Sequence, residues 1–331
     1  MKKLTVCPAT LQSGFDTYSP SAVKKLFDGQ AVSHIIDFDF EDEQDVTNAR
    51  ENMGKMSISG AQEKFSAVVD QGKFRLAHPG EQSTFILKPA PLNYISTRKQ
   101  IPANEHLTMQ IASQVYGILT ASNALCFTPK GHPVYVTKRF DVNPDLTKCP
   151  IEDFASLLGM TEQASDSNFK YNGNYAMIAD AIRAFVPSWV IETERFFKLV
   201  VFNYMFANGD AHVKNFSLIS HNGEYFLAPA YDLINTRIHL EGDDFALKGG
   251  LSPDIEPSDA MLRTGHPCRT DFERFADRIA LPGKRAARVL DSFSTIHPEV
   301  YDLIDRSFLN DKMKRLYKRV IEQRLQWFIR F

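Results

Sequence analysis

Short runs of alternating apolar and polar residues fill the chain from about residue 56 to 141. The turn Gln71-Gly72 separates two such runs and predicts a hairpin, and the turn Lys130-Gly131 separates two more. The predicted strands cover residues 65–70, 73–78, 83–89 and the two halves of 124–142. Between them, residues 102–118 carry apolar side chains at helical spacing and end in Gly117-Ile118. This region therefore predicts a mostly antiparallel sheet with one helix.

Beyond about residue 150 the apolar residues recur at helical spacing instead of alternating. Helical segments are predicted over residues 151–160, 176–185, 192–207, 270–279, 283–293 and 298–331. One hairpin, at residues 216–227 with the turn His221-Asn222-Gly223, interrupts them. The expected fold is α+β and bilobal, with a small β-rich N-lobe over residues 1–141 and a larger, mostly α-helical C-lobe over residues 142–331.

Size and composition fit a globular protein of this kind. The chain has 331 residues, of which 44% are hydrophobic and 24% charged, so it is long enough for two lobes around a cleft. Its formal net charge is −2, whereas a protein that binds nucleic acid over its whole surface usually has a strong basic excess. The net charge therefore does not indicate nucleic-acid binding over the whole surface. A local basic face near the end of the chain stays open, although a solvated helix face is the simpler interpretation of Lys312, Lys314, Arg315, Lys318, Arg319 and Arg324.

The cysteines and the apolar runs indicate the compartment. Four cysteines stand far apart and never as C-x-x-C, which argues against a zinc site or a disulfide framework and fits a reducing cytoplasm. The start MKKLTVCPATLQSG has no apolar run typical of a signal peptide. No stretch of about 18 apolar residues occurs either. We therefore expect a cytoplasmic protein with no membrane span.

Asp210 and Asn215 stand in the spacing D-x-x-x-x-N, between a predicted helix and a predicted hairpin. This is the spacing of a protein-kinase catalytic loop, where the aspartate accepts the proton of the attacking hydroxyl and the asparagine binds magnesium. Asp232 follows the hairpin, where kinases keep a further carboxylate ligand for Mg²⁺. A simpler alternative stays open at this point, in which Asn208-Gly209-Asp210 is a helix-stopping turn and Asp232 a cap.

Two residues upstream favour the kinase interpretation. Lys88 ends the apolar run Phe85-Ile86-Leu87, and Glu105 lies in the helix that follows. Kinases place a lysine of this kind on the ATP phosphates and pair it with a helix glutamate. The segment MSISGAQEKF, residues 56–65, has a single glycine where kinases use G-x-G-x-x-G, so taken alone it predicts only a turn.

Taken together, these motifs resemble the HipA-like serine/threonine kinases of bacterial toxin–antitoxin systems. The segments that carry the resemblance are, in chain order, SISGAQEKF, FILKP, ANE, VTKRFD, NGDAHVKNFSL and LAPAYDL. They run from Ser57 to Asp232, and the remaining helical part is compatible with the C-terminal lobe of that family. The length most resembles the short HipT-type members.

The resemblance implies a role for each matching residue. It makes Asp210 the catalytic base, Asn215 and Asp232 the magnesium ligands, and Lys88 the phosphate-binding lysine with Glu105 as its partner. Further residues are implied to bind ATP: the phosphate loop with Ser57, Ser59, Gly60 and Gln62, the hinge backbone at Lys138 and Phe140, and His212 and Lys214 near the phosphates. Ser57 matches the serine that the family autophosphorylates, and Ser59 is a second candidate.

Two positions depart from the family pattern. Lys138 stands where family members often have glutamate, which leaves side-chain contacts to the nucleotide open at the hinge. Ser59 replaces a small apolar residue.

The function implied by the resemblance is that of a growth-inhibiting toxin linked to persistence. It would be a Mg²⁺–ATP-dependent kinase that phosphorylates an aminoacyl-tRNA synthetase, the glutamyl- or tryptophanyl-enzyme. The implied partners are a DNA-binding HipB-like antitoxin, through which it would meet DNA indirectly, and a small HipS-like protein. The rival interpretation is an inactive kinase-fold scaffold in an antitoxin–DNA complex. A dinuclear metallophosphatase is a weaker rival, since its G-N-H-[DE] motif does not occur.

Overall fold

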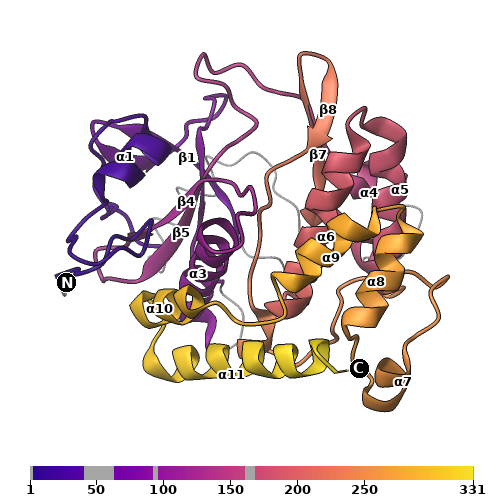
Figure 1. Cartoon of the computed structure of the whole chain (residues 1–331). Coiled ribbons are helices and arrows are strands. Elements are labelled where there is room, and N and C mark those ends of the chain that lie inside the picture. Colours follow the sequence, from indigo (N-terminus) through magenta and orange to yellow (C-terminus); the bar gives the residue numbers. More distant parts are fainter. Residues whose placement is uncertain (1–2, 41–62, 92–95, 161–167, 331) are drawn as a thin grey trace. The chain divides into compact units, whose positions relative to one another are not determined.

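The computed structural model describes residues 3–40, 63–91, 96–160 and 168–330 (Figure 1). The chain forms two compact units, each assembled from segments that are separate in the sequence. The first unit comprises residues 1–110, 121–148 and 302–314, and the second comprises residues 111–120, 149–301 and 315–331. The predicted lobes divide the chain once, at residue 141, whereas these units also exchange two short segments.

The first unit contains a five-stranded antiparallel sheet with the strand order β2-β1-β3-β5-β4. Its strands are β1 (Phe65–Asp70), β2 (Lys73–Leu76), β3 (Phe85–Lys88), β4 (Asn123–Phe127) and β5 (Pro133–Lys138). Gln71 and Gly72, which join β1 to β2, both have positive φ angles, of 47° and 75°. A two-residue hairpin of this kind matches the right-handed twist of the strands. The predicted mostly antiparallel sheet is confirmed.

Among the described residues before β6, three helical segments belong wholly or mostly to the first unit: α1 (Pro20–Phe27), the 3-10 turn η1 (Arg98–Gln100) and α3 (Ile101–Gln114). Helix α3, labelled in Figure 1, is the helix that the sequence predicts between the strands. Its buried polar residues are hydrogen bonded: Gln110 Nε2 donates to Asn123 Oδ1 of β4 over 2.8 Å, and Thr108 Oγ1 donates to the Asn104 carbonyl over 2.9 Å. These bonds offset the desolvation of the polar groups.

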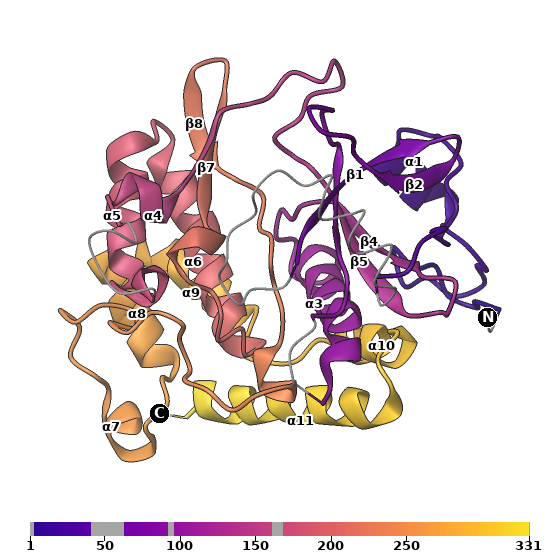
Figure 2. The same ribbon diagram turned by 180° about the vertical axis from the view of Figure 1, so that it is seen from behind.

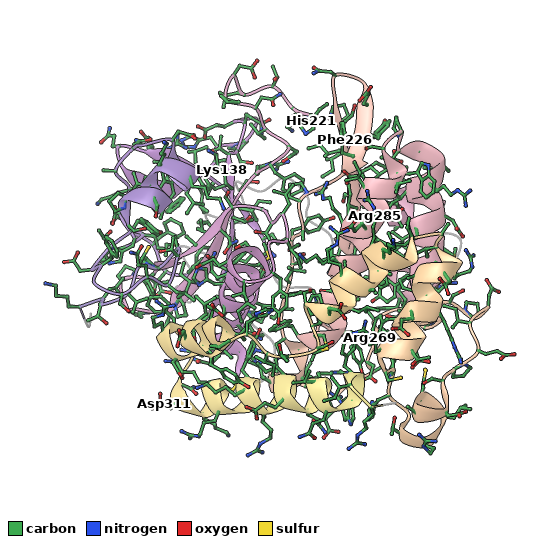
Figure 3. All side chains as sticks on the ribbon, viewed as in Figure 1. Lys138, His221, Phe226, Arg269, Arg285 and Asp311 are labelled. Atoms are coloured by element: carbon green, nitrogen blue, oxygen red, sulfur yellow. The ribbon has the colours of Figure 1, made fainter. Side chains whose placement is uncertain are left out.

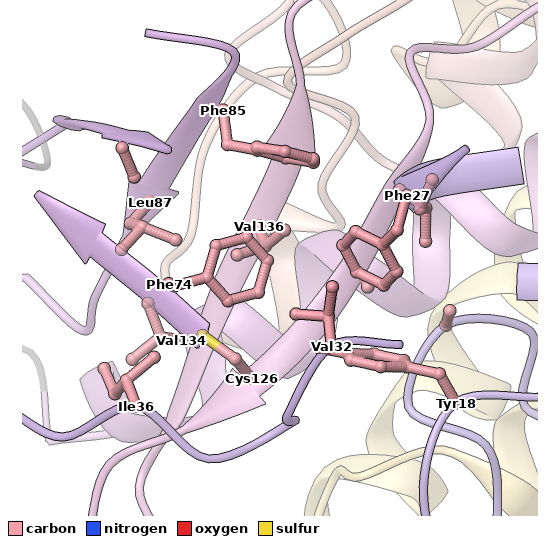
Figure 4. Close-up of a cluster of buried hydrophobic side chains, with 14 of the residues drawn as sticks. Tyr18, Phe27, Val32, Ile36, Phe74, Phe85, Leu87, Cys126, Val134 and Val136 are labelled. Carbon is pink, nitrogen blue, oxygen red and sulfur yellow. The ribbon is translucent and has the colours of Figure 1, made fainter. Parts of the chain in front are cut away.

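Aromatic side chains fill the core on one face of this sheet (Figure 4). The rings of Phe27, Phe74 and Phe85 meet at centroid distances of 5.3 to 5.8 Å. Val134 and Val136 of β5 alternate into the same cluster, as the period of a strand requires. The cluster therefore ties α1 to the strands that carry the candidate site of this unit.

The second unit has a three-stranded antiparallel sheet made of β6 (Ile151–Asp153), β7 (Ser217–His221) and β8 (Glu224–Leu227). The predicted hairpin at residues 216–227 is confirmed, with Asn222 and Gly223 at positive φ in its turn. Figure 3 labels His221 and Phe226, whose rings lie 6.3 Å apart on the two strands of this hairpin.

The prediction of a helix from residue 151 is wrong for its first three residues. Ile151 pairs with Ile219, so that residues 151–153 form β6, and the helix begins only after Asp153, whose side chain accepts a hydrogen bond from the Ser156 amide. A pairing with a strand more than 60 residues away is a tertiary contact that local periodicity does not contain.

The remaining helices belong to the second unit, except that residues 302–306 of α10 and 311–314 of α11 fall in the first (Figures 1 and 2). They are α4 (Phe154–Leu157), η2 (Phe169–Tyr171), α5 (Tyr175–Phe185), α6 (Trp189–Met205), η3 (Val213–Asn215), η4 (Thr236–Ile238), α7 (Asp259–Thr264), α8 (Arg269–Arg278), α9 (Gly283–Asp291), α10 (Pro298–Arg306) and α11 (Asp311–Phe328). Helix α6 packs against α5, α9 and β8.

The predicted segment 298–331 is two helices, because Asn310 accepts a hydrogen bond from the Met313 amide and starts α11. None of the described helices combines the length and apolarity needed to cross a membrane.

Candidate active site

Asp210 and Asn215 lie on one tight loop after the end of α6. The Asn215 side-chain amide donates to the Asp210 carbonyl over 2.9 Å, and the His212 backbone amide donates to the same carbonyl over 2.8 Å. Their spacing of five residues therefore has a structural reason, since it lets the asparagine close the loop on the aspartate backbone.

The loop is also fixed to the segment that carries Asp232. Gly209 donates its amide to Thr236 Oγ1 over 3.0 Å, and the Thr236 amide donates to the Ala207 carbonyl over 3.0 Å. A Cβ atom on Gly209 would lie only 3.0 Å from that threonine oxygen. Asn208 Nδ2 is 3.4 Å from the Asp232 carbonyl. Asp232 itself has a φ of 57°, a left-handed backbone that is uncommon outside glycine.

The Asp210 carboxylate is held on one side and open on the other. The Tyr171 hydroxyl donates to Oδ1 over 2.7 Å, and His212 Nε2 lies 4.0 Å from the same oxygen. The side chain of Asp210 is 47% exposed, so the carboxylate can meet a group that arrives from solvent. This is the position that a base for an incoming hydroxyl must have.

Sequence reasoning missed Tyr171. It lies 39 residues before Asp210, on η2, in a stretch without a chemical motif. Burial, and then the neighbouring Asp210 carboxylate, raise the pKa of the Tyr171 hydroxyl, so this group remains a proton donor at neutral pH.

His212 is buried beside the carboxylate. Its burial lowers its pKa to about 4, against a smaller opposite effect of Asp210, so the imidazole is neutral at pH 7. Its Nδ1 atom has no hydrogen-bond partner among the described residues. Lys214, by contrast, is exposed, and its ammonium lies 5.6 Å from the centre of the Phe169 ring.

The side chains of Asn215 and Asp232 suit a magnesium ion. Asn215 uses its nitrogen for the Asp210 carbonyl, which leaves its Oδ1 as an acceptor with no hydrogen bond from a described residue. Within the described ranges, no group of three or more His, Cys, Asp or Glu residues could hold a metal alone. One carboxylate and one amide oxygen are nevertheless a set that Mg²⁺ accepts, since it usually completes its shell with water and substrate phosphates.

In the first unit the structure brings Lys88 and Glu105 together. The Lys88 ammonium on β3 lies 2.5 Å from Glu105 Oε1 on α3, and each side chain is 4% exposed. The ammonium also lies 5.2 Å from the centre of the Tyr135 ring. Two charges removed from water in this way require good geometry and further hydrogen bonds to be tolerated.

The other predicted nucleotide-binding residues have separate places. Lys138, labelled in Figure 3, ends β5 and pairs with Asp28 over 2.8 Å, while its backbone amide donates to the Ser122 carbonyl. Phe140 is partly buried in the segment after that strand. The predicted phosphate-loop residues Ser57, Ser59, Gly60 and Gln62 lie outside the described residues.

A match to a protein-family model identifies the family, which the geometry alone does not. Residues 56–300, which include the candidate residues of both units, match the model of the HipA-like C-terminal domain. The chain belongs to this family. The resemblance inferred from the motifs is thereby confirmed.

Three relatives among known proteins carry the name "Putative kinase". Y4dM from Sinorhizobium fredii is 32% identical over 222 residues, covering 62% of this chain and 51% of that protein. A Haemophilus influenzae protein is 23% identical, covering 84% of this chain and 82% of its own length. The chain thus spans about half the length of Y4dM, and 46% of a second Sinorhizobium relative, Y4mE.

Among solved structures, the Shewanella oneidensis toxin–antitoxin complex of HipA, HipB and operator DNA has a similar fold. The match has a TM-score of 0.65 at 18% identity and covers 86% of this chain and 70% of the HipA-like chain. At this identity the likeness concerns the fold alone. The predicted α+β fold of the protein-kinase type is confirmed.

Proposed function

We propose that the protein is a Mg²⁺–ATP-dependent serine/threonine protein kinase. The observation that carries the proposal is the loop from Asp210 to Asn215, which holds a half-exposed carboxylate beside an amide oxygen suited to magnesium. The buried ion pair of Lys88 and Glu105 supports it, because this pair is the usual device for holding ATP phosphates in a kinase.

In this mechanism the chain positions groups and neutralises charge more than it forms covalent bonds. Asp210 orients the acceptor hydroxyl and accepts its proton. Lys88 contacts the phosphates of ATP, and Glu105 holds the lysine ammonium in place. Asn215 and Asp232 would hold a magnesium ion, which would supply further neutralisation of phosphate charge when bound.

Family membership supports a more specific proposal for the cellular role. The protein acts as the toxin of a toxin–antitoxin system and inhibits growth by phosphorylating an aminoacyl-tRNA synthetase, the glutamyl- or tryptophanyl-enzyme. Its partners are a HipB-like DNA-binding antitoxin and a small HipS-like protein. The antitoxin part is supported by the fold shared with the Shewanella complex of HipA, HipB and operator DNA.

Autophosphorylation of Ser57 or Ser59 completes the proposal. A phosphoserine adds about −1.5 to −2 charges at neutral pH, which would repel the phosphates of ATP in this loop. The modification would therefore lower ATP binding and limit the activity of the toxin.

Purified protein incubated with γ-labelled ATP and Mg²⁺ tests the proposal. We expect label on serine, mapped by mass spectrometry to Ser57 or Ser59, and loss of that label in the Ser57→Ala/Ser59→Ala double variant. A protein that binds a HipB-like antitoxin but neither consumes ATP nor becomes labelled would be the inactive scaffold instead.

Phosphoproteomics after brief expression in cells tests the proposed substrate. We expect a new phosphoserine on a single synthetase in cells with the active protein. Growth arrest with every synthetase unmodified would contradict the substrate while leaving the kinase activity intact.

A further inference from the structure

The Tyr171 hydroxyl contacts only one of the two oxygens of the Asp210 carboxylate. The hydroxyl donates to Oδ1 of Asp210 over 2.7 Å, while Oδ2 accepts no hydrogen bond from any residue that the structure describes. Because a carboxylate turns freely about its χ2 bond in water, a single strong donor on one oxygen fixes the direction of the other. The open oxygen is the one that can meet an acceptor hydroxyl.

The backbone around Tyr171 is built into the second unit. A ladder joins residues 171–176 to residues 248–251: the amides of Lys248 and Gly249 donate to the carbonyls of Tyr171 and Gly173, and those of Tyr175 and Ala176 donate to the carbonyls of Gly250 and Leu251, all over 2.9 to 3.1 Å. A Cβ atom on Gly249 would lie 2.8 Å from the Gly173 carbonyl oxygen, so this close approach needs glycine.

The side chain of Tyr171 is also held in place. Its ring meets the His212 ring edge-on at 5.3 Å, and the Lys170 ammonium lies 4.9 Å from its centre. Four residues further along the chain, the Tyr175 hydroxyl donates to the Ala211 carbonyl over 3.0 Å. Two tyrosines of the same segment therefore hold the catalytic loop, one by its carboxylate and one by its backbone.

We propose that Tyr171 is a positioning residue that fixes the Asp210 carboxylate for phosphoryl transfer, with Oδ1 held by the tyrosine and Oδ2 facing the acceptor hydroxyl. This inference rests on the proposed kinase function. A tyrosine that merely filled the acceptor place until substrate arrived would have to move away. The backbone ladder and the ring contact with His212 oppose such a movement.

Tyr171→Phe tests the inference, because it removes the hydroxyl and keeps the ring. We expect kcat for phosphoryl transfer to fall by about tenfold or more, the size of one hydrogen bond to a charged group. KM for ATP and the affinity for nucleotide should stay within about twofold, since Tyr171 does not contact the nucleotide in this account. Tyr171→Ala should lose a similar factor in kcat.

Tyr301→Phe is the matched control. The Tyr301 hydroxyl also donates to a carboxylate, Glu322 Oε1 over 3.2 Å, but this pair joins α10 to α11 on an exposed surface. We expect wild-type kcat for this variant and a thermal unfolding midpoint close to that of Tyr171→Phe. The comparison separates loss of any tyrosine–carboxylate bond from loss of the one at Asp210.

Several results would overturn the inference. Wild-type kcat in Tyr171→Phe with a slow Tyr171→Ala would mean that only the ring matters. A kcat above the wild-type value in Tyr171→Phe would mean that the tyrosine hydroxyl blocks the acceptor. Phosphate found on Tyr171 of the wild type would mean that this tyrosine is itself an acceptor. If the wild type transfers no phosphate, both the proposed kinase function and this inference are wrong. The other results contradict only this inference.

Discussion

The candidate residues of the first unit and those of the second unit differ in how they hold charge. In the first unit, Lys88 and Glu105 form an ion pair in which each side chain is 4% exposed. In the second, the Asp210 carboxylate is 47% exposed and is held by a hydroxyl on one oxygen. Burial gives a charge a fixed position at a high desolvation cost, whereas partial exposure keeps a carboxylate accessible to an incoming group. The first arrangement suits a group that binds, and the second suits a group that reacts.

The largest expected effect is that of removing Lys88, a group suited to binding rather than to reaction. Lys88→Met should lower kinase activity by roughly a hundredfold or more, as for loss of one electrostatic stabiliser. It should also lower the free energy of unfolding by about 3–5 kcal/mol, because the buried Glu105 carboxylate loses the ammonium 2.5 Å from its Oε1 atom. Urea unfolding and labelled-ATP transfer on the same sample measure both quantities.

The double variant Lys88→Met/Glu105→Leu sharpens this prediction. Replacing a buried ion pair by apolar side chains of similar volume is often neutral for stability. We therefore expect the double variant to regain most of the lost stability and none of the activity. Equal stability of the single and double variants would show that Glu105 does not depend on Lys88.

Asn215→Ala tests whether Asn215, beside the partly exposed Asp210 of the second unit, is a magnesium ligand. We expect the Mg²⁺ concentration for half-maximal activity to rise by at least the roughly tenfold that loss of a supporting contact costs a metal site. The free energy of unfolding without Mg²⁺ should fall by about 0.5–1.5 kcal/mol, because the variant also loses the hydrogen bond from the Asn215 amide to the Asp210 carbonyl. An unchanged Mg²⁺ requirement would remove Asn215 from the metal site.

The smallest expected effect is a pH dependence from a buried, uncharged group of the first unit. His106 Nε2 lies 3.0 Å from the Ala9 carbonyl, and Nδ1 has no partner among the described residues. Burial lowers the pKa of His106 to about 4, below its value near 6.5 in the unfolded chain. Its contribution to stability is therefore complete above pH 6.5 and is lost as the pH falls toward 4.

For His106 alone we expect a loss of roughly 1–2 kcal/mol in the free energy of unfolding between pH 7 and pH 5. His106→Gln, which keeps a donor for the Ala9 carbonyl, should unfold with a shallower pH dependence over this range. His212 and His239 have similarly lowered pKa values and remain in both proteins, so only the difference in slope is diagnostic. Identical slopes would contradict the assignment.

Sequence reasoning predicted the features that depend on residues close together in the chain. The hairpin at Gln71-Gly72 and the spacing of Asp210 and Asn215 follow from turn chemistry and from one loop closing on itself. The pairing of Lys88 with Glu105 could be anticipated because a strand-end lysine precedes a single helix. These are relations between residues that are at most 17 positions apart.

It failed where distant segments decide the structure. Residues 151–153 were expected to be helical but form a strand, because Ile151 pairs with Ile219. Tyr171 contacts Asp210, 39 residues away, from a segment that a backbone ladder joins to residues 248–251. Neither contact leaves a signal in the residues nearby, so only the folded chain reveals them.

The most direct test of the central claim is single-turnover transfer from γ-labelled ATP by the wild type and by Asp210→Asn. Nucleotide binding is measured on the same samples, and Asp277→Asn, on the exposed side of α8, serves as the control. We predict that all three proteins bind Mg²⁺–ATP and that Asp210→Asn alone transfers phosphate at least roughly a hundredfold more slowly. Transfer by Asp210→Asn at the wild-type rate would contradict the account.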